Sequence, residues 1–374
     1  MASGLSWKRS EEQTLDRIRR FLRREMQDGV LAVLPVAIDA DEHWRAFKAK
    51  WHWERYADGE ERPFPSNEEI LDRVQIGLQQ RGQAEDDWLP VVYSVLDGGD
   101  DMPRGLFGAP MRFFHRPYFA YSAGEPPLPD WSQLPKLRFS LSSCWPQRML
   151  DIQKHFERHA AGRFAQHTCL TMDAMNFALM MRGATESYLD LYEHPAEIRQ
   201  LMEIGLDFNI RFQEAQFEVI PRYRDGCFCW LTGWTPFERA ISLSVDAFVL
   251  CSTKTYAECG LEYQARLIRR FGHGLMHFHC NRADLAAEVA RLPGLELFQY
   301  GAGLPAGPPD HTCLPEIRKA VGDIPIMVSY PLELFRQGLS DGTLMPNVMY
   351  GVHGPALSVD EANRLMEQVR AYRA

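Results

Sequence analysis

Short apolar runs alternate with longer amphipathic stretches over most of this chain. The runs occupy residues 89–96, 163–170, 226–231, 246–251, 274–280, 295–300, 324–330 and 347–352. Between several of them, apolar residues recur at helical spacing, as they do in residues 253–272. Alternating strands and helices predict an α/β fold with a parallel sheet, and about eight strands favour a closed (β/α)8 TIM barrel over an open sheet. No GxGxxG motif follows any run, so the pattern does not favour a dinucleotide-binding fold.

Two parts of the chain do not follow this alternation. Residues 1–85 predict helices, with Ser10 and Ser66 as N-caps. We expect these residues to form an N-terminal helical extension packed on a barrel domain of residues 86–374. Residues 97–162 are rich in proline, glycine and aromatic residues. They predict a long excursion from the first strand that covers the barrel mouth, because long ordered loops often serve as functional lids.

Composition narrows the class of protein. Of the 374 residues, 45% are hydrophobic and 24% charged, which is typical of a soluble globular protein. The net charge of -9 argues against nucleic acid or an anionic membrane as the main partner, and the basic run at 17–24 is interpreted as a solvated helix face. No stretch reaches the roughly 18 apolar residues that span a bilayer, and the polar N-terminus does not resemble a signal peptide. The 8 cysteines include no CxxC pair, so we expect a cytoplasmic protein with reduced thiols.

The clearest chemical pattern is the pair His277 and His279, at the end of the run 274–280. Strand alternation places both side chains on one face. If this strand lines a barrel, both imidazoles point inward near the C-terminal rim, where barrel active sites lie. Two such imidazoles can share a metal ion, and a catalytic zinc takes three protein ligands and keeps one open position. The alternative is that one histidine is a hydrogen-bonded core residue.

Other predicted strand ends also carry candidate residues. His353 follows the last run, and it either completes a three-histidine site, acts alone as a proton donor or anion partner, or lies in a plain turn. Cys227 and Cys229 are candidate metal ligands, although free cysteines are also common small core residues. The remaining candidates for substrate contacts at strand ends or rim turns are Trp230, Asp246, Gln299, Tyr300 and Tyr330.

Four passages carry a resemblance to a known family: 181–202, 241–272, 277–281 and 350–372. They resemble the uroporphyrinogen-decarboxylase-like superfamily, which includes the decarboxylase itself and zinc-dependent corrinoid methyltransferases. Ser244 and Asp246 fall on the family's Ser-x-Asp. The methyltransferase branch then has His-x-Cys-Gly-Asn, where this chain has His277 and Asn281 at the matching places, His279 at the cysteine and Cys280 at the glycine.

The resemblance implies a (β/α)8 barrel, a zinc ion, a corrinoid as co-substrate on a partner protein, and a homodimer. In the similar methyltransferases one histidine and two cysteines hold zinc, and His279 and His353 stand at the places of those cysteines. The resemblance therefore implies His277, His279 and His353 as metal ligands. Three neutral imidazoles leave more positive charge on the ion than two thiolates do, which suits activation of water or a hydroxyl.

Three functions remain open on the sequence. The first is a metal-dependent methyltransferase that moves a methyl group between a corrinoid and a small acceptor or donor. The second is a decarboxylase or lyase on a small acidic substrate, with the histidines and Asp246 as proton donors and charge stabilisers. True uroporphyrinogen decarboxylation is not expected, because the family's arginine-rich N-terminal motif is missing. The third is a non-catalytic ligand-binding barrel, since fold alone does not prove activity.

Overall fold

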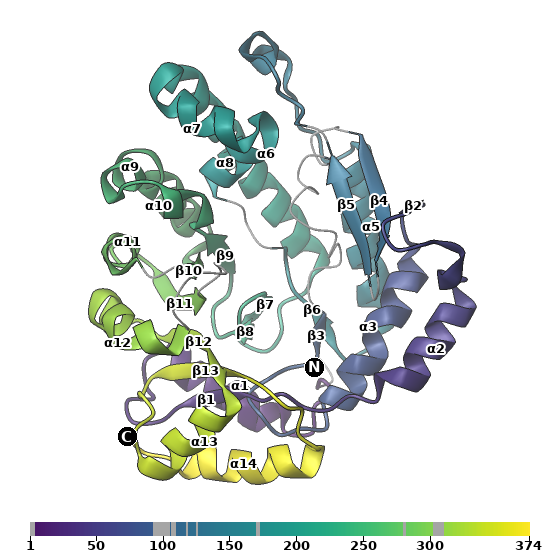
Figure 1. Ribbon diagram of the computed structural model, residues 1–374, viewed down its shortest axis with the longest axis vertical. Coiled ribbons are helices and arrows are strands. Elements are labelled where there is room, and N and C mark those ends of the chain that lie inside the picture. The colour runs from purple at the N-terminus through teal and green to yellow at the C-terminus, as the bar shows by residue number, and fades with distance from the viewer. Residues whose placement is uncertain are drawn as a thin grey trace.

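The computed structural model describes residues 4–92, 105, 110–116, 119–124, 126–169, 173–279, 282–301 and 310–374. Its centre is a 6-stranded parallel sheet in the order β1-β13-β12-β11-β10-β9, and a separate parallel pair, β3-β6. These strands are β1 (Leu31–Val33), β3 (Val91–Val92), β6 (Ala165–Gln166), β9 (Ala240–Ser244), β10 (His273–His279), β11 (Leu295–Gly301), β12 (Ile326–Pro331) and β13 (Val348–His353). Figure 1 shows them around a common interior, with helices outside. The predicted α/β class with a parallel sheet is confirmed.

Most helices follow a strand and pack on the outside of these sheets (Figure 1). They are α2 (Ala40–Lys50), α3 (Asn67–Arg81), α5 (Cys144–Ala160), α6 (Ala174–Arg182), α7 (Ala184–Glu193), α8 (Pro195–Val219), α9 (Thr253–Cys259), α10 (Leu261–Phe271), α11 (Ala283–Val289), α12 (Asp310–Val321), α13 (Leu332–Asp341) and α14 (Val359–Ala371). The last begins with a capping box, in which Ser358 Oγ accepts the N–H of Glu361 and Glu361 accepts the N–H of Ser358. No helix in the described ranges is long and apolar enough to cross a membrane.

Strand alternation divides the core into two layers. On β10, Met276 and Phe278 point outward and join the core between strands and helices, while Leu275 points inward. We call the side that carries Leu275 the inner face. Its core also contains one inward residue from each of several other strands, among them Leu31, Val91, Ala165, Ala240, Leu297 and Met349. A polar residue on the inner face beyond this core therefore faces the interior rather than a helix.

One end of the interior is filled by a helix and a hairpin. The hairpin consists of β7 (Cys227–Cys229) and β8 (Gly233–Thr235), and the helix is α1 (Glu11–Leu22). Apolar side chains of α1, including Ile18 and Phe21, pack into the inner core together with Trp234, which has no exposed surface. The described residues thus fill the interior at the N-terminal ends of the strands, and a site in the interior is expected at their C-terminal ends.

Two carboxylates occupy the gap between β1 and β3. Asp87 Oδ2 accepts the backbone N–H of Ala32, and Asp86 Oδ2 accepts that of Leu34, both at 2.8 Å. Ala32 lies in β1 and Leu34 directly follows it. Because β1 is the edge strand of its sheet, these two N–H groups have no neighbouring strand to bond on this side, and the carboxylates pair them instead. The side chains of Arg81, Lys8 and Arg17 surround the two carboxylates.

Several sequence predictions need correction. The run 246–251 is not a strand but the 3-10 helix η3 (Asp246–Leu250), because Ser244 Oγ accepts the N–H of Asp246 and the chain turns there. The strand before it, β9, was missed because its small and polar residues do not form an apolar run. The run 226–231 forms the β7–β8 hairpin instead of a parallel strand.

The N-terminal predictions are confirmed in part. Residues 1–85 contain the predicted helices, but they also contain β1, which pairs with β13 in the main sheet. Ser66 caps α3 through a hydrogen bond from the N–H of Glu69, whereas Ser10 makes no cap bond. The described part of the excursion 97–162 forms the hairpin of β4 (Met111–Arg116) and β5 (Phe119–Gly124), which β2 (Glu61–Arg62) joins, and then η2 (Trp131–Lys136) and α5.

Candidate metal centre

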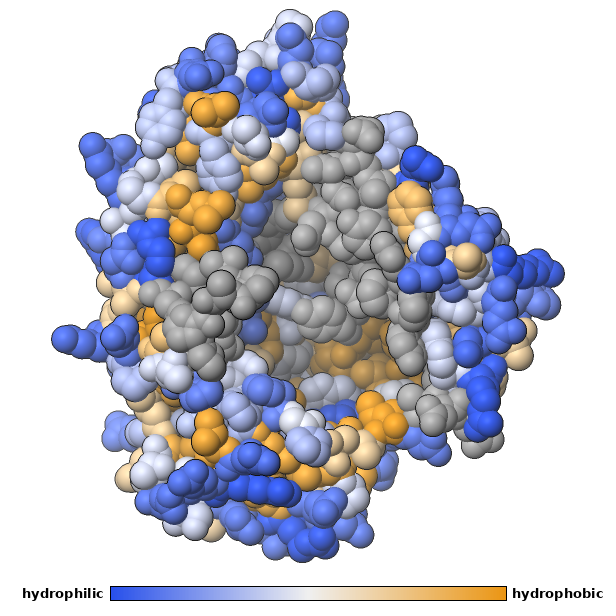
Figure 2. Space-filling view, in the orientation of Figure 1, coloured by the Kyte–Doolittle hydropathy of each residue, from blue (hydrophilic) through white to orange (hydrophobic). Residues whose placement is uncertain are grey.

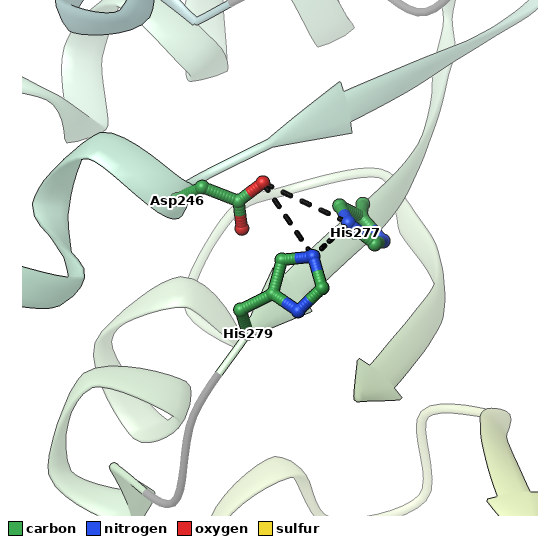
Figure 3. A group of neighbouring side chains, drawn as sticks. All are labelled: Asp246, His277 and His279. Carbon is green, nitrogen blue, oxygen red and sulfur yellow. Dashed lines mark hydrogen bonds and ion pairs between the residues drawn. The ribbon is translucent and has the colours of Figure 1, made fainter. Parts of the chain in front are cut away.

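Three predicted site residues meet at the C-terminal ends of two neighbouring strands. His277 and His279 lie on the inner face near the end of β10, and Asp246 begins η3 directly after β9. The register pairs Ser244 with His277, so the end of β9 brings Asp246 beside the two imidazoles. Figure 3 shows the carboxylate and both rings pointing toward one another. We call this group the Asp246–His277–His279 cluster.

The donor atoms of the cluster lie close together. His277 Nε2 and His279 Nε2 are 2.6 Å apart, and Asp246 Oδ2 lies 3.7 Å from the first and 4.0 Å from the second (Figure 3). In the described part of the chain, this is the one group of three such side chains compact enough to hold a metal ion. Around an ion with bonds of about 2.1 Å, donor atoms lie roughly 3.0–3.4 Å apart. The cluster would need only small side-chain shifts to reach these separations.

Hydrogen bonds fix the orientation of one ring. Gln299 Oε1, on the adjacent strand β11, accepts a hydrogen bond from His277 Nδ1. The proton on Nδ1 leaves the lone pair of Nε2 directed into the cluster. Burial lowers the pKa of His277, and the charge of His279 adds to this, while Asp246 and Gln299 act in the opposite direction. His277 is therefore neutral at neutral pH, which is the form that binds a metal ion.

Two buried polar atoms of the cluster have no hydrogen-bond partner among the described residues. They are Asp246 Oδ1 and His279 Nδ1. A buried acceptor without a partner costs free energy, and such atoms in a folded protein often mark a site for an ion or ligand. The donor set and these two atoms fit a divalent metal ion.

His353 is not part of this cluster. Along one row of the sheet, His277 pairs with Gln299, Gln299 with Met327, and Met327 with Met349. His353 lies four residues beyond Met349, on a strand three places away from β10, and it is exposed. The compact group among the described residues therefore does not include His353, and its third side chain is that of Asp246.

Besides Asp246, the structure separates the other four predicted substrate contacts. Trp230 and Gln299 lie at the cluster, and the Trp230 ring meets the His277 ring edge-on with centroids 5.0 Å apart. Tyr300 is only 1% exposed and belongs to the core under the helices, so it cannot contact a ligand in the interior. Tyr330 also points to that side, where it contacts Tyr350. Tyr300 and Tyr330 were misplaced because alternation puts them on the opposite face from Gln299 and Met327.

Of the two alternatives for Cys227 and Cys229, the structure agrees with the core position and not with metal binding. Both thiols are buried in the inner core, where they lie 3.5 Å from Thr235 Oγ1 and 3.1 Å from Thr232 Oγ1 respectively. Burial raises the pKa of Cys229 to about 12, so this residue remains a protonated thiol rather than a metal-binding thiolate. Cys280 and Asn281, which carry part of the family resemblance, lie outside the described residues.

Sequence reasoning missed a buried carboxyl near the cluster. Asp173 is 1% exposed and caps α6, because its Oδ1 accepts the N–H of Asn176 at 2.7 Å. Burial raises the pKa of Asp173 to about 7; the N–H of Asn176 opposes this shift and the nearby charge of Asp246 adds to it. An aspartate directly before an apolar helical run is a recognisable N-cap signal, and it would have pointed to this residue.

The Asp173→Asn variant is expected to lose less stability than the wild type when the pH is raised from 5 to 8. The folded protein keeps the proton of this carboxyl up to about pH 7, whereas the unfolded chain releases it near pH 4. The protonated Asp173 therefore contributes fully to the free energy of unfolding below about pH 4. This contribution, about 4 kcal/mol at most, is lost as the pH rises through 7. Asparagine keeps the acceptor for the N–H of Asn176 and does not ionise. Urea denaturation of chelator-treated protein at pH 5 and pH 8 measures the difference; an equal pH dependence in both proteins would contradict it.

A cavity of about 170 Å³ opens beside the cluster. Its wall includes Trp230, which contacts His277, together with Met327 and Met349 from the row of strands that carries His277. Figure 2 shows a recess in one face of the molecule, with hydrophobic residues visible at its floor. The cavity is therefore linked to the cluster through Trp230, which lines the cavity and contacts His277.

Comparison with known proteins supports the fold. No protein-family model and no curated protein matches this chain. Among solved structures, a methyltransferase from Methanosarcina mazei is similar to it, with a TM-score of 0.59, and the match covers 96% of this chain and 98% of that chain. The sequences are 12% identical. At this identity the likeness shows a shared fold, and the chemistry rests on the site.

Proposed function

We propose that this protein is a metal-dependent methyltransferase that acts at the Asp246–His277–His279 cluster. The observation that carries the proposal is the position of this cluster, at the C-terminal ends of parallel strands in a fold shared with a methyltransferase. A likeness over nearly the whole chain supports a closed (β/α)8 barrel built from the six-stranded sheet and the β3-β6 pair. Active sites of such barrels lie at this end.

The residues of the cluster have separate tasks in this proposal. His277, His279 and Asp246 would hold a divalent ion, and Gln299 orients His277 for that purpose. The bound ion would act as a Lewis acid and lower the pKa of a group attached to it. Two imidazoles and one carboxylate suit Zn²⁺, Fe²⁺, Co²⁺ or Mn²⁺, whereas the similar methyltransferases use thiolates. Trp230 covers His277 and limits the access of water from its side.

The methyl carrier in this proposal is a corrinoid on a partner protein, as the family resemblance implies. The alternative function, decarboxylation of an acidic substrate, requires a positive charge that holds the carboxylate. The cavity beside the cluster has no arginine or lysine among the described residues that line it. This observation favours methyl transfer over the decarboxylase.

The direct test is methyl transfer to reduced cobalamin. The metal-loaded protein is mixed with Co(I) cobalamin and a panel of small methyl ethers, methyl thioethers and methylamines, and the visible spectrum follows formation of methylcobalamin. We expect transfer from at least one donor class with the wild type and none with His279→Ala, which removes one ligand of the cluster. Equal rates with the wild type, the variant and no protein would refute the proposed function.

A further inference from the structure

The cavity beside the cluster is built from parts of the chain that lie far apart in sequence. It is lined by Val33 from β1, Val91 from β3, the hairpin turn at Trp230–Gly233, Met327 from β12 and Met349 from β13. Most of these side chains are apolar and belong to the inner core or pack against it. The cavity therefore lies between residues of the six-stranded sheet, of the β3-β6 pair and of the hairpin turn.

One residue links the cavity to the metal-binding residues. Trp230 lines the cavity, and its ring also meets the His277 ring edge-on with centroids 5.0 Å apart. Met327 and Met349, which also line the cavity, belong to the same sheet as His277 and lie on its inner face. A molecule in the cavity is therefore separated from His277 by Trp230.

The polar groups in the wall carry little available charge. Asp87 accepts hydrogen bonds from Arg17 Nε at 2.6 Å and from the N–H of Ala32 at 2.8 Å, so its charge is compensated by the guanidinium. Burial lowers the pKa of His167 to about 4, which leaves this imidazole neutral at pH 7. Thr232 Oγ1 donates to the carbonyl of Trp234 at 2.8 Å. The described residues of the wall thus offer no unpaired ion to a charged ligand.

The size of the cavity sets the size of its ligand. An engineered apolar cavity of about 150 Å³ in another protein binds benzene, and the cavity here measures about 170 Å³. A single six-membered ring with one small substituent therefore matches the volume of this cavity. A carboxylate or ammonium placed here would lose its hydration without gaining a partner, which is strongly unfavourable.

We infer that this cavity binds the uncharged, ring-sized apolar part of the substrate, next to the Asp246–His277–His279 cluster. The inference deepens the proposed function and rests on it for the identification of the ligand as a substrate. The substrate class is then a small neutral aromatic or alicyclic compound. Its substituent reaches toward His277, past the edge of Trp230.

Three probes of nearly equal size test the charge preference. Benzyl alcohol is neutral, benzoate is negative and benzylammonium is positive at pH 7, and isothermal titration calorimetry measures the affinity of each for metal-loaded and for metal-free protein. We expect benzyl alcohol to bind at least about tenfold more tightly than either ion in both forms. Stronger binding of benzoate or of benzylammonium would overturn the uncharged class.

Binding inside the cavity is measured separately in the wild type. With methyl-labelled methionine, the ring current of bound benzyl alcohol is expected to shift the NMR signals of Met327 and Met349, which are assigned through Met327→Leu and Met349→Leu. Val33→Phe, which fills the cavity, should abolish both binding and shifts, and Val74→Phe on the outer helix α3 serves as the matched control. Unshifted methionine signals in the presence of saturating probe would overturn the inference, even if Val33→Phe does not fold.

These results are distinguishable from failure of the proposed function. Benzyl alcohol binding to the metal-free protein needs neither the ion nor a methyl carrier. Binding of the neutral ring without any methyl transfer would leave the cavity assignment intact and refute the reaction. Methyl transfer from a charged aliphatic donor, with no ring binding, would do the reverse.

Discussion

Replacing His279 by alanine is expected to reduce the bound divalent metal from near one ion per chain to near zero. The Nε2 atom of His279 lies 2.6 Å from that of His277 and 4.0 Å from Asp246 Oδ2, so its loss leaves only two donors. Two protein ligands do not hold a catalytic ion firmly, because such sites take three. Elemental mass spectrometry after dialysis against Zn²⁺, Co²⁺ or Mn²⁺ measures the ratio of ion to protein.

The position of the third ligand is tested in the same experiment. Asp246→Ala should also lose the ion, whereas His353→Ala should retain it, because His353 lies outside the cluster and is exposed. His273→Ala is a matched histidine control on the same strand, since His273 pairs with Glu296 at the opposite end of β10. Loss of the ion from His353→Ala and its retention in Asp246→Ala would restore the three-histidine site and refute the cluster.

The sequence was sufficient to find two of the three residues in this cluster as a pair. His277 and His279 share a face because the strand repeat is two residues, and a local pattern can express this. The grouping with Asp246 could not be read locally, because it depends on where β9 ends and on how the chain turns there. His353 was assigned to the site through a family position, while its distance from His277 depends on the register of three strand pairs.

The fold shows the same division between local and distant information. The strands β10 to β13 were found because each has six or seven residues, most of them apolar, and so forms a recognisable run in the sequence. β1 and β9 were missed, since one is very short and the other contains two serines. The carboxylates of Asp86 and Asp87 between β1 and β3 gave no sequence signal, because the backbone N–H groups that they accept, of Leu34 and Ala32, come from 50 or more residues away.

This junction between β1 and β3 is the place where one substitution should most reduce stability. Asp86 has no exposed surface, and its carboxylate bonds Arg81 Nη1 at 3.0 Å and the N–H of Leu34 at 2.8 Å. Lys8 Nζ lies 3.4 Å away and is equally buried. Burial opposes ionisation, but the charges of Arg81 and Lys8 outweigh it and lower the pKa of Asp86, so the carboxylate is ionised at neutral pH.

Asp86→Ala is therefore expected to lower the free energy of unfolding by about 3–5 kcal/mol, the usual cost of removing one partner from a buried ion pair. The variant leaves the ammonium of Lys8 and the guanidinium of Arg81 without their carboxylate, and it leaves the N–H of Leu34 unpaired. Urea denaturation at pH 7 measures the change. Asp225→Ala is the matched control: its exposed pair with Arg19 should contribute no more than about 1 kcal/mol. Equal losses in the two variants would show that Asp86 does not join β1 to β3 as described.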